Sequence, residues 1–216
     1  MDDTSPPQPA DFINRRFETR VFLQTAGLGA LLIPTAFLFA AGLPIDLLGL
    51  IRLDVRDALI GLAATAPLIA SLRWFMVSQW NPLVRFRLSQ LKFFSEIGFE
   101  LTPARNAVLA VIAGVSEELL FRGVLQSAAE RFLPVVFAIA LPAILFGLLH
   151  ARTVMYAIIA AAVGLYLGLM FWGTQGLTAP IITHTLYDFV AFEWTRRAVV
   201  EYRNSPSTSA SHLPLP

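Results

Sequence analysis

The most informative absence in this chain is cysteine, of which its 216 residues contain none. Disulfide bridges, thiol nucleophiles and cysteine-ligated zinc sites are therefore excluded. Charged side chains are also scarce: they make up 14% of the residues, against about 25% in soluble domains. The net charge is only +1, and no basic stripe marks a nucleic-acid-binding surface, so we expect no nucleic-acid partner.

Apolar residues are abundant, at 56% of the chain with a mean hydropathy of +0.65. We predict an all-α fold: a polytopic integral membrane helical bundle in the lipid bilayer, with about six transmembrane helices and one interfacial amphipathic helix. There is no internal repeat and no second domain. We divide the chain into a polar N-terminal segment (1–20), one transmembrane bundle (21–203, with candidate catalytic motifs in 105–192) and a disordered tail (204–216).

The predicted spans are apolar stretches separated by polar turns. Pro34 and Pro142 are expected to kink the first and fourth of them. The segment 81–103 mixes aromatic and charged residues and is too polar to span, so it is predicted to lie on the membrane surface. Residues 1–11 are polar and proline-rich, and are expected to be disordered. The spans cover about 21–41, 58–77, 106–130, 134–150, 154–172 and 178–194.

Arginine and lysine are distributed unevenly between the two sides of such a bundle. If both termini lie on one side, that side collects eleven of these residues and the opposite side three. Cytoplasmic loops carry the excess of positive charge in membrane proteins. We therefore expect both termini in the cytoplasm.

Three ionisable residues interrupt the span from about Asn106 to Glu130. Glu117, Glu118 and Arg122 stand in the run GVSEELLFRG. An ionisable group inside a span costs at least about 2.5–3.5 kcal/mol on insertion scales and usually marks a functional site. Residues four apart share a face of a helix, so Glu118 and Arg122 can pair, whereas Glu117 points elsewhere. An unpaired carboxyl group in a dry setting is a candidate general acid or base.

Two of the three histidines lie within or at the end of later spans. His150 closes the run FGLLH, in which Phe146 stands one turn earlier, and His184 stands one turn before Asp188. A lone histidine in a span is commonly a hydrogen bond between helices. Two histidines, an aspartate and Glu117 on three separate helices instead predict one shared polar site.

These residue types leave two mechanisms open. In the first, Glu117 and one imidazole activate a water that attacks a peptide carbonyl, while the other polar helix stabilises the oxyanion. In the second, Glu117, His150 and His184 are ligands of a zinc ion, a His₂Glu set of the kind that metalloproteases use. The usual HExxH helix is absent, but ligands on three helices can still converge on one ion.

The runs GVSEELLFRG, FGLLH and APIITHTLYD together resemble the motifs of the CPBP intramembrane proteases, also called the ABI family, which are related to the type II CAAX prenyl endopeptidase. The resemblance covers about residues 105–192, with the motifs in the right order. It implies a helical bundle in which Glu117 and His150 activate the hydrolytic water and His184 stabilises the oxyanion. It also implies a glutamate-dependent mechanism without a metal cofactor, and mainly structural roles for Glu118 and Arg122.

The chain departs from the prenyl-protease members at Asp188, where they have asparagine. An amide can donate a hydrogen bond to an oxyanion, whereas an ionised aspartate only accepts. Either Asp188 is protonated in its site, or it acts on the oxyanion only through His184. We favour the second, in which Asp188 accepts a hydrogen bond from His184 and orients its ring.

The expected function is that of an intramembrane endopeptidase acting on a membrane-associated peptide or protein. The arginine-rich composition and six-span plan favour the inner membrane of a prokaryote. The rival class is a non-catalytic immunity or scaffold protein that keeps the polar cluster for helix packing. A small transporter should show two related halves with interrupted helices, and the sequence has no such symmetry.

Overall fold

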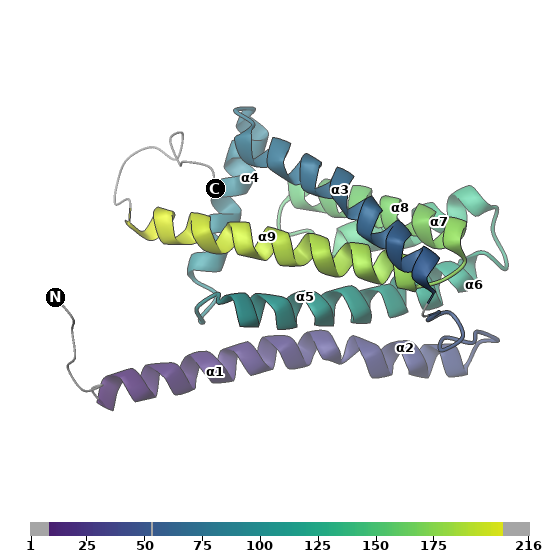
Figure 1. The fold of residues 1–216 in the computed structure, drawn as a ribbon, viewed down its shortest axis with the longest axis horizontal. Coiled ribbons are helices and arrows are strands. Elements are labelled where there is room, and N and C mark those ends of the chain that lie inside the picture. The colour runs from purple at the N-terminus through teal and green to yellow at the C-terminus, as the bar shows by residue number, and fades with distance from the viewer. Residues whose placement is uncertain (1–8, 53, 205–216) are drawn as a thin grey trace.

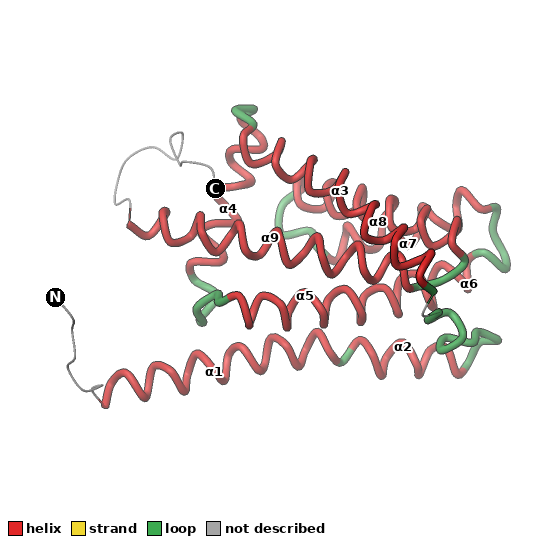
Figure 2. The backbone as a smooth tube through the Cα atoms, viewed as in Figure 1, coloured by secondary structure: helices red, strands yellow, loops and turns green. Residues whose placement is uncertain are grey.

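A computed structural model describes residues 9–52 and 54–204 of the chain, and the regular elements in this part are all helices (Figures 1 and 2). The helices run up and down, so that the start of α1 and the end of α9 lie at the same end of the bundle (Figure 1). In chain order they are α1 (Pro9–Ala30), α2 (Leu32–Ala41), α3 (Val55–Val77), α4 (Asn81–Ser95), α5 (Pro103–Glu118), η1 (Leu119–Gln126), α6 (Ser127–Ala129), α7 (Val135–Leu149), α8 (Val154–Thr174) and α9 (Thr178–Asn204).

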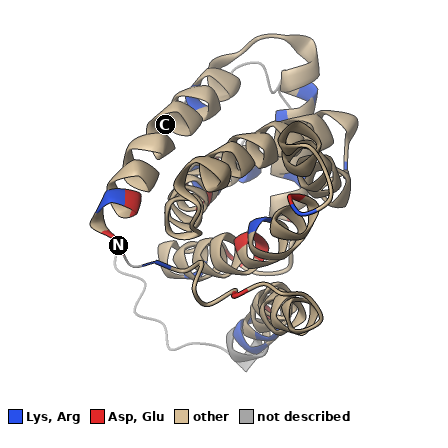
Figure 3. Cartoon of the chain, turned by 90° about the vertical axis from the view of Figure 1, so that its right-hand side faces the viewer, with Lys and Arg blue, Asp and Glu red and all other residues tan. Residues whose placement is uncertain are grey.

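Within the described residues, three helical stretches are long and apolar enough to cross a membrane, namely Asn14–Ala41, Val55–Val77 and Val154–Thr174, and α7 is a shorter apolar helix. Charged residues are thinly scattered over the bundle, as the view along its axis shows (Figure 3). These features confirm an all-helical membrane protein. The predicted total of six spans stays a prediction, because the helices that carry the candidate site residues are more polar.

The first predicted span is interrupted where proline removes a helical hydrogen bond. Helices α1 and α2 meet at Leu31, three residues before Pro34, whose missing N–H leaves the carbonyl of Ala30 without its usual partner. The N–H of Leu31 still donates to the carbonyl of Gly27 at 3.0 Å, and that of Thr35 to the carbonyl of Leu31 at 3.2 Å. The two segments therefore stay in line, and the break lies at the turn before Pro34.

The start of α1, the end of α9 and the end of the surface helix α4 differ from the predictions. Helix α1 begins at Pro9, a residue suited to a first helical turn, so the disorder predicted for 1–11 is wrong over 9–11, and 1–8 lie outside the described residues. Of the predicted tail, Asn204 is still helical and 205–216 lie outside that part. The surface helix ends at Ser95, and Gly98, with φ of 89°, turns the chain toward α5.

The centre of the bundle is held by close approaches between helices that glycine permits. Helix α9 lies between α3 and α5 (Figure 1). A side chain on Gly61 of α3 would place its Cβ 2.7 Å from the carbonyl oxygen of Ala179, and one on Gly114 of α5 would collide with Thr185. Small residues let membrane helices pack at this distance. Because Gly114 stands one turn before Glu118, the same contact sets the spacing between the motif helix and α9.

Candidate active site

The site is built from three elements that are far apart in sequence. Glu117 and Glu118 end α5, just where the helix continues as the π-helix η1. His150 is the C-cap of α7, and His184 and Asp188 stand one turn apart on α9. The structure brings all five side chains together, as the distances below show.

Glu117 faces both histidines across short gaps. Its Oε2 lies 4.0 Å from Nε2 of His150 and 3.9 Å from Nε2 of His184. The same oxygen is buried and has no hydrogen-bond partner among the residues that the structure describes. Both gaps are too long for a direct hydrogen bond, and each is a span that one water molecule can bridge. A buried polar atom of this kind requires an explanation, and a reactant water is one.

The ring of His150 is held in one orientation by its own helix. Nδ1 lies 2.8 Å from the carbonyl oxygen of Phe146, one turn earlier. Because a carbonyl only accepts, Nδ1 carries the proton and a neutral ring presents its lone pair on Nε2, toward Glu117. The Phe146 ring lies against the imidazole, with centroids 4.4 Å apart and planes tilted by 31°. Phe146 thus supports His150 through both its backbone and its ring.

A buried chain of hydrogen bonds holds His184. Its Nδ1 lies 2.7 Å from Oε1 of Glu118, and the same oxygen accepts from the guanidinium of Arg122 at 2.6 Å. Arg122 in turn donates to the carbonyl of Gly164 on α8 at 2.7 Å. The side chains of Glu118 and Arg122 are 0% and 1% exposed. The predicted pairing of Glu118 with Arg122 is confirmed, and the pair extends further than predicted because it reaches His184 at one end and α8 at the other.

Asp188 lies beside the second nitrogen of the same ring. Its Oδ2 is 3.5 Å from Nε2 of His184, at the outer limit of a hydrogen bond. Nε2 therefore faces two carboxylates, those of Asp188 and Glu117. This arrangement is compatible with the orienting role expected for Asp188, which stays a prediction.

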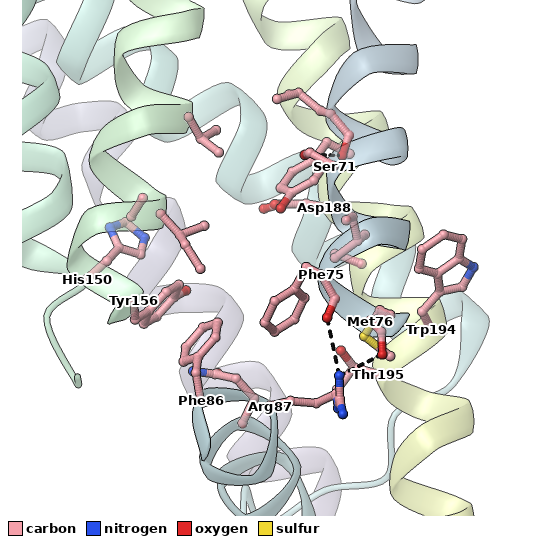
Figure 4. Close-up of a pocket in the computed structure, with 18 of the residues that line it drawn as sticks. Ser71, Phe75, Met76, Phe86, Arg87, His150, Tyr156, Asp188, Trp194 and Thr195 are labelled. Atoms are coloured by element: carbon pink, nitrogen blue, oxygen red, sulfur yellow. Dashed lines mark hydrogen bonds between the residues drawn. The ribbon is translucent and has the colours of Figure 1, made fainter. Parts of the chain in front are cut away.

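A cavity of about 700 Å³ opens beside these groups. Its volume lies in the range of small-molecule sites. Figure 4 shows His150 and Tyr156 on one wall and Asp188 on the opposite one. Most of the lining is apolar or aromatic and comes from α3, α4, α8 and α9, and the carboxylate and imidazole groups form its polar region. An extended apolar segment that entered this cavity would come to lie beside Glu117.

Three features of the site could not be found from the sequence. Arg87 of α4 is 8% exposed and caps α3, because its Nη1 donates to the carbonyls of Phe75, Met76 and Ser78 at 3.2, 2.6 and 3.3 Å (Figure 4). Tyr156 packs against His150, with ring centroids 5.6 Å apart. The third is η1 itself. Spacing gave no signal for any of them, since each depends on how distant helices meet.

The alternative of a zinc ion held by Glu117, His150 and His184 finds no preformed set of ligands. Among residues 9–52 and 54–204, no group of three or more His, Asp or Glu side chains is arranged to hold a metal ion. Nδ1 of His184 is engaged by Glu118, and its Nε2 also faces Asp188. The expectation of a mechanism without metal stays a prediction.

The fold and the site together define a class of protein, a helical membrane protein with carboxylates and imidazoles buried inside its bundle. Residues 100–190, which contain all of these groups, match the family model described as type II CAAX prenyl endopeptidase Rce1-like. The match confirms the resemblance seen in the motifs: residues 100–190 are similar to the type II CAAX prenyl endopeptidases of the CPBP/CAAX protease family. Comparisons with curated proteins and with solved structures found no match.

Proposed function

We propose that the chain is an intramembrane endopeptidase in which Glu117 and His150 activate water against a peptide bond of a membrane-associated substrate. One observation carries the proposal. The buried Oε2 of Glu117 has no partner among the described residues and lies 4.0 Å and 3.9 Å from the two Nε2 atoms, beside the cavity. A water bound there contacts a base and an imidazole at once. General-base catalysis of this kind contributes about 10²–10⁴-fold to the rate.

The reaction follows from the acceptors and donors at hand. Glu117 takes a proton from the water, Nε2 of His150 accepts a hydrogen bond from the O–H that remains, and the water oxygen bonds to the substrate carbonyl carbon. The carbonyl π electrons move to its oxygen, and His184 in its charged form donates to that oxyanion from Nε2. The tetrahedral intermediate then collapses, the C–N bond breaks, and Glu117 returns its proton to the leaving amine. No metal or other cofactor is part of this scheme.

Glu118 and Asp188 act in this scheme through His184. Glu118 accepts from Nδ1 and fixes the ring plane, at 2.7 Å. Asp188, 3.5 Å from Nε2, holds the other edge of the ring and favours its charged form. Both are positioning residues, because neither needs to touch the substrate.

We further propose six spans with both termini in the cytoplasm of a prokaryotic cell, in its inner membrane. The start of α1 and the end of α9 lie at one end of the bundle (Figure 1). With both termini on one side, that side collects eleven of the arginine and lysine residues against three. The cavity, lined mainly by apolar side chains, favours a substrate with an apolar segment. The partners are then the lipid bilayer and a peptide or protein within it.

The test is proteolysis by the full chain in detergent against a panel of membrane peptides. Wild type is compared with Glu117→Gln, and with Glu96→Gln, an exposed carboxylate on the same chain, as the matched control. We expect Glu117→Gln to lose at least about 10²-fold in kcat while its thermal unfolding stays unchanged, and Glu96→Gln to behave as wild type. Activity in Glu117→Gln equal to that of wild type would refute the proposal.

The same assay separates the two alternatives. Activity that a zinc chelator abolishes and added zinc restores would make Glu117, His150 and His184 metal ligands. We expect activity to survive the chelator. A protein that cleaves nothing and whose Glu117→Gln variant unfolds would instead be a scaffold or immunity protein that keeps its polar cluster for packing.

A further inference from the structure

The oxyanion of the proposed reaction would form beside a carboxylate that cannot donate to it. Nε2 of His184 is the donor that the mechanism uses, and it lies 3.9 Å from Oε2 of Glu117 and 3.5 Å from Oδ2 of Asp188. Glu117 loses its negative charge when it takes the proton of the water, but an ionised Asp188 can only accept. Oxyanion stabilisation depends on fixed donors aimed at the developing charge. A second donor on the other side of the reacting carbonyl would add to the single donor that His184 supplies.

Tyr156 is a hydroxyl-bearing residue on the wall of the cavity that carries His150. It stands in the first turn of α8 and lines the same cavity as Glu117 and His184. Its ring meets that of His150 edge to face, with centroids 5.6 Å apart and an angle of 85° between the planes. Figure 4 shows it beside His150 on the same wall, across the cavity from Asp188.

The tyrosine ring is fixed while its hydroxyl is available. The ring packs between those of His150 and Phe86, whose centroids lie 5.6 Å away on each side, and the guanidinium of Arg152 lies 5.2 Å from its centroid. The backbone N–H donates to Oγ1 of Thr153 at 3.1 Å, which fixes the first turn of the helix. The hydroxyl itself has no hydrogen bond to any residue in the described part of the chain. A hydroxyl that is held in place and has no other hydrogen-bond partner can donate to a negative charge that develops on the substrate.

We propose that Tyr156 is a further catalytic residue, whose hydroxyl donates a hydrogen bond to the carbonyl oxygen of the scissile peptide as that oxygen becomes negative. The inference rests on the proposed function. In the step concerned, the water oxygen forms a bond to the carbonyl carbon, the water proton passes to Glu117, and the π electron pair moves to the oxygen. The hydroxyl of Tyr156 keeps its proton and shares it with the oxyanion until the C–N bond breaks.

Two other tyrosines line the cavity and serve as internal comparisons. The hydroxyl of Tyr166 is already engaged, because it donates to the carbonyl of Ala64 at 2.9 Å. Tyr187 is the neighbour of Asp188 on α9, and among the described residues its ring has no stacking contact with either histidine. Tyr156 is the one of the three that packs on the ring of His150.

The experiment uses a membrane peptide that wild type cleaves, an ester of the same sequence, and a phosphonate analogue that mimics the tetrahedral intermediate. Tyr156→Phe is the test variant, since phenylalanine keeps the ring contacts with His150, Phe86 and Arg152 and removes only the hydroxyl. Tyr166→Phe makes the same chemical change on the same helix, and Tyr187→Phe makes it on α9. Thermal unfolding is recorded for each.

We expect Tyr156→Phe to lose about 10²-fold in kcat for both the peptide and the ester, with KM changed less than about threefold. Its affinity for the phosphonate should fall by the same factor as kcat/KM, because the lost bond forms only to the tetrahedral state. Tyr166→Phe and Tyr187→Phe remove a hydroxyl from the same cavity, and each should lose at least about tenfold less in kcat than Tyr156→Phe, because neither donates to the oxyanion.

Three results would overturn the inference. Unchanged kcat and unchanged phosphonate affinity in Tyr156→Phe would show that the reaction needs no donor at this position. A loss confined to the peptide, with the ester unaffected, would mean that Tyr156 protonates the leaving amine instead. A greater loss in Tyr187→Phe would move the role to α9. Each of these leaves the proposed function standing if Glu117→Gln is inactive, whereas an active Glu117→Gln variant refutes that function itself.

Discussion

The two ends of the sequence form regions that use polarity in opposite ways. In the apolar window of the first span, Asn14–Ala41, 11% of the residues are buried inside the bundle, against 33% in that of α8. The ion pair of the first span, between Glu18 and Arg105, is partly exposed. The later helices instead bury Glu118, Arg122 and His184 in one connected network. Most residues of the first span are therefore exposed at the surface of the bundle, whereas the later helices bury the ionisable side chains of the candidate site.

The contrast predicts that the same substitution will have different consequences in the two regions. In the buried network, Arg122→Met should lower the free energy of unfolding by about 3–5 kcal/mol, because it leaves Glu118 as a buried charge without its counter-ion. At the partly exposed pair, Arg105→Met should cost about 1 kcal/mol or less. Unfolding in mild detergent with a denaturant series measures both. Equal losses for the two variants would contradict the distinction drawn between the regions.

A smaller effect is expected from filling the close approach between α5 and α9. Gly114→Ala places a methyl group against Thr185, which should cost about 1–3 kcal/mol by overpacking and lower kcat by moving Glu117 away from His184. The control is Gly27→Ala on the first span, where nothing lies within 4 Å of the added Cβ.

For Gly27→Ala, stability should stay the same or rise by up to about 1 kcal/mol, because alanine is the better helix former. Thermal unfolding and peptide cleavage are measured on both glycine variants. A Gly114→Ala protein with unchanged activity would show that this contact does not set the geometry of the site.

The smallest effect is expected at Asp188, which acts on the proposed reaction only through His184. Asp188→Asn removes a charge 3.5 Å from Nε2 of His184 without changing the size of the side chain. Loss of a hydrogen bond to a charged group is worth about 1.5 kcal/mol, so kcat should fall about tenfold with no change in unfolding. The readout is the pH profile of kcat beside that of wild type. Full activity with an unchanged profile would show that the charge is not required.

Local rules predicted most of the fold. Apolar length located the helices, since each membrane span must satisfy its own backbone hydrogen bonds. It missed their polar ends, because α1 begins at Pro9 and α9 continues to Asn204, beyond the apolar stretches. The i,i+4 rule paired Glu118 with Arg122, and that pair is observed at 2.6 Å. At Pro34 the predicted kink is replaced by a one-residue interruption at Leu31, one turn earlier, because the carbonyl that proline leaves unpaired belongs to Ala30.

The parts of the site that depend on how helices meet were not accessible from the sequence. The bond from His184 to Glu118 joins residues 66 positions apart, and the cap that Arg87 makes on α3 depends on the direction in which α4 leaves that helix. Spacing within one helix carries no record of either contact. The prediction that Glu117 lies near two histidines rested on the argument that polar residues on three apolar helices share one site. In the structure, Oε2 of Glu117 lies 4.0 Å and 3.9 Å from the Nε2 atoms of His150 and His184.

The π-helix η1 has a consequence for how this region can change over evolution. Over Leu119–Gln126 the backbone bonds skip five residues instead of four, so the chain holds an extra residue relative to a regular helix. The surplus lets Glu117 face α9 while Gln126 donates to the carbonyl of Gly168 on α8 at 3.0 Å. Deleting one residue between them would restore a regular helix and rotate one end by about 100° against the other. Between Glu117 and Gln126, length is therefore as strongly constrained as residue identity.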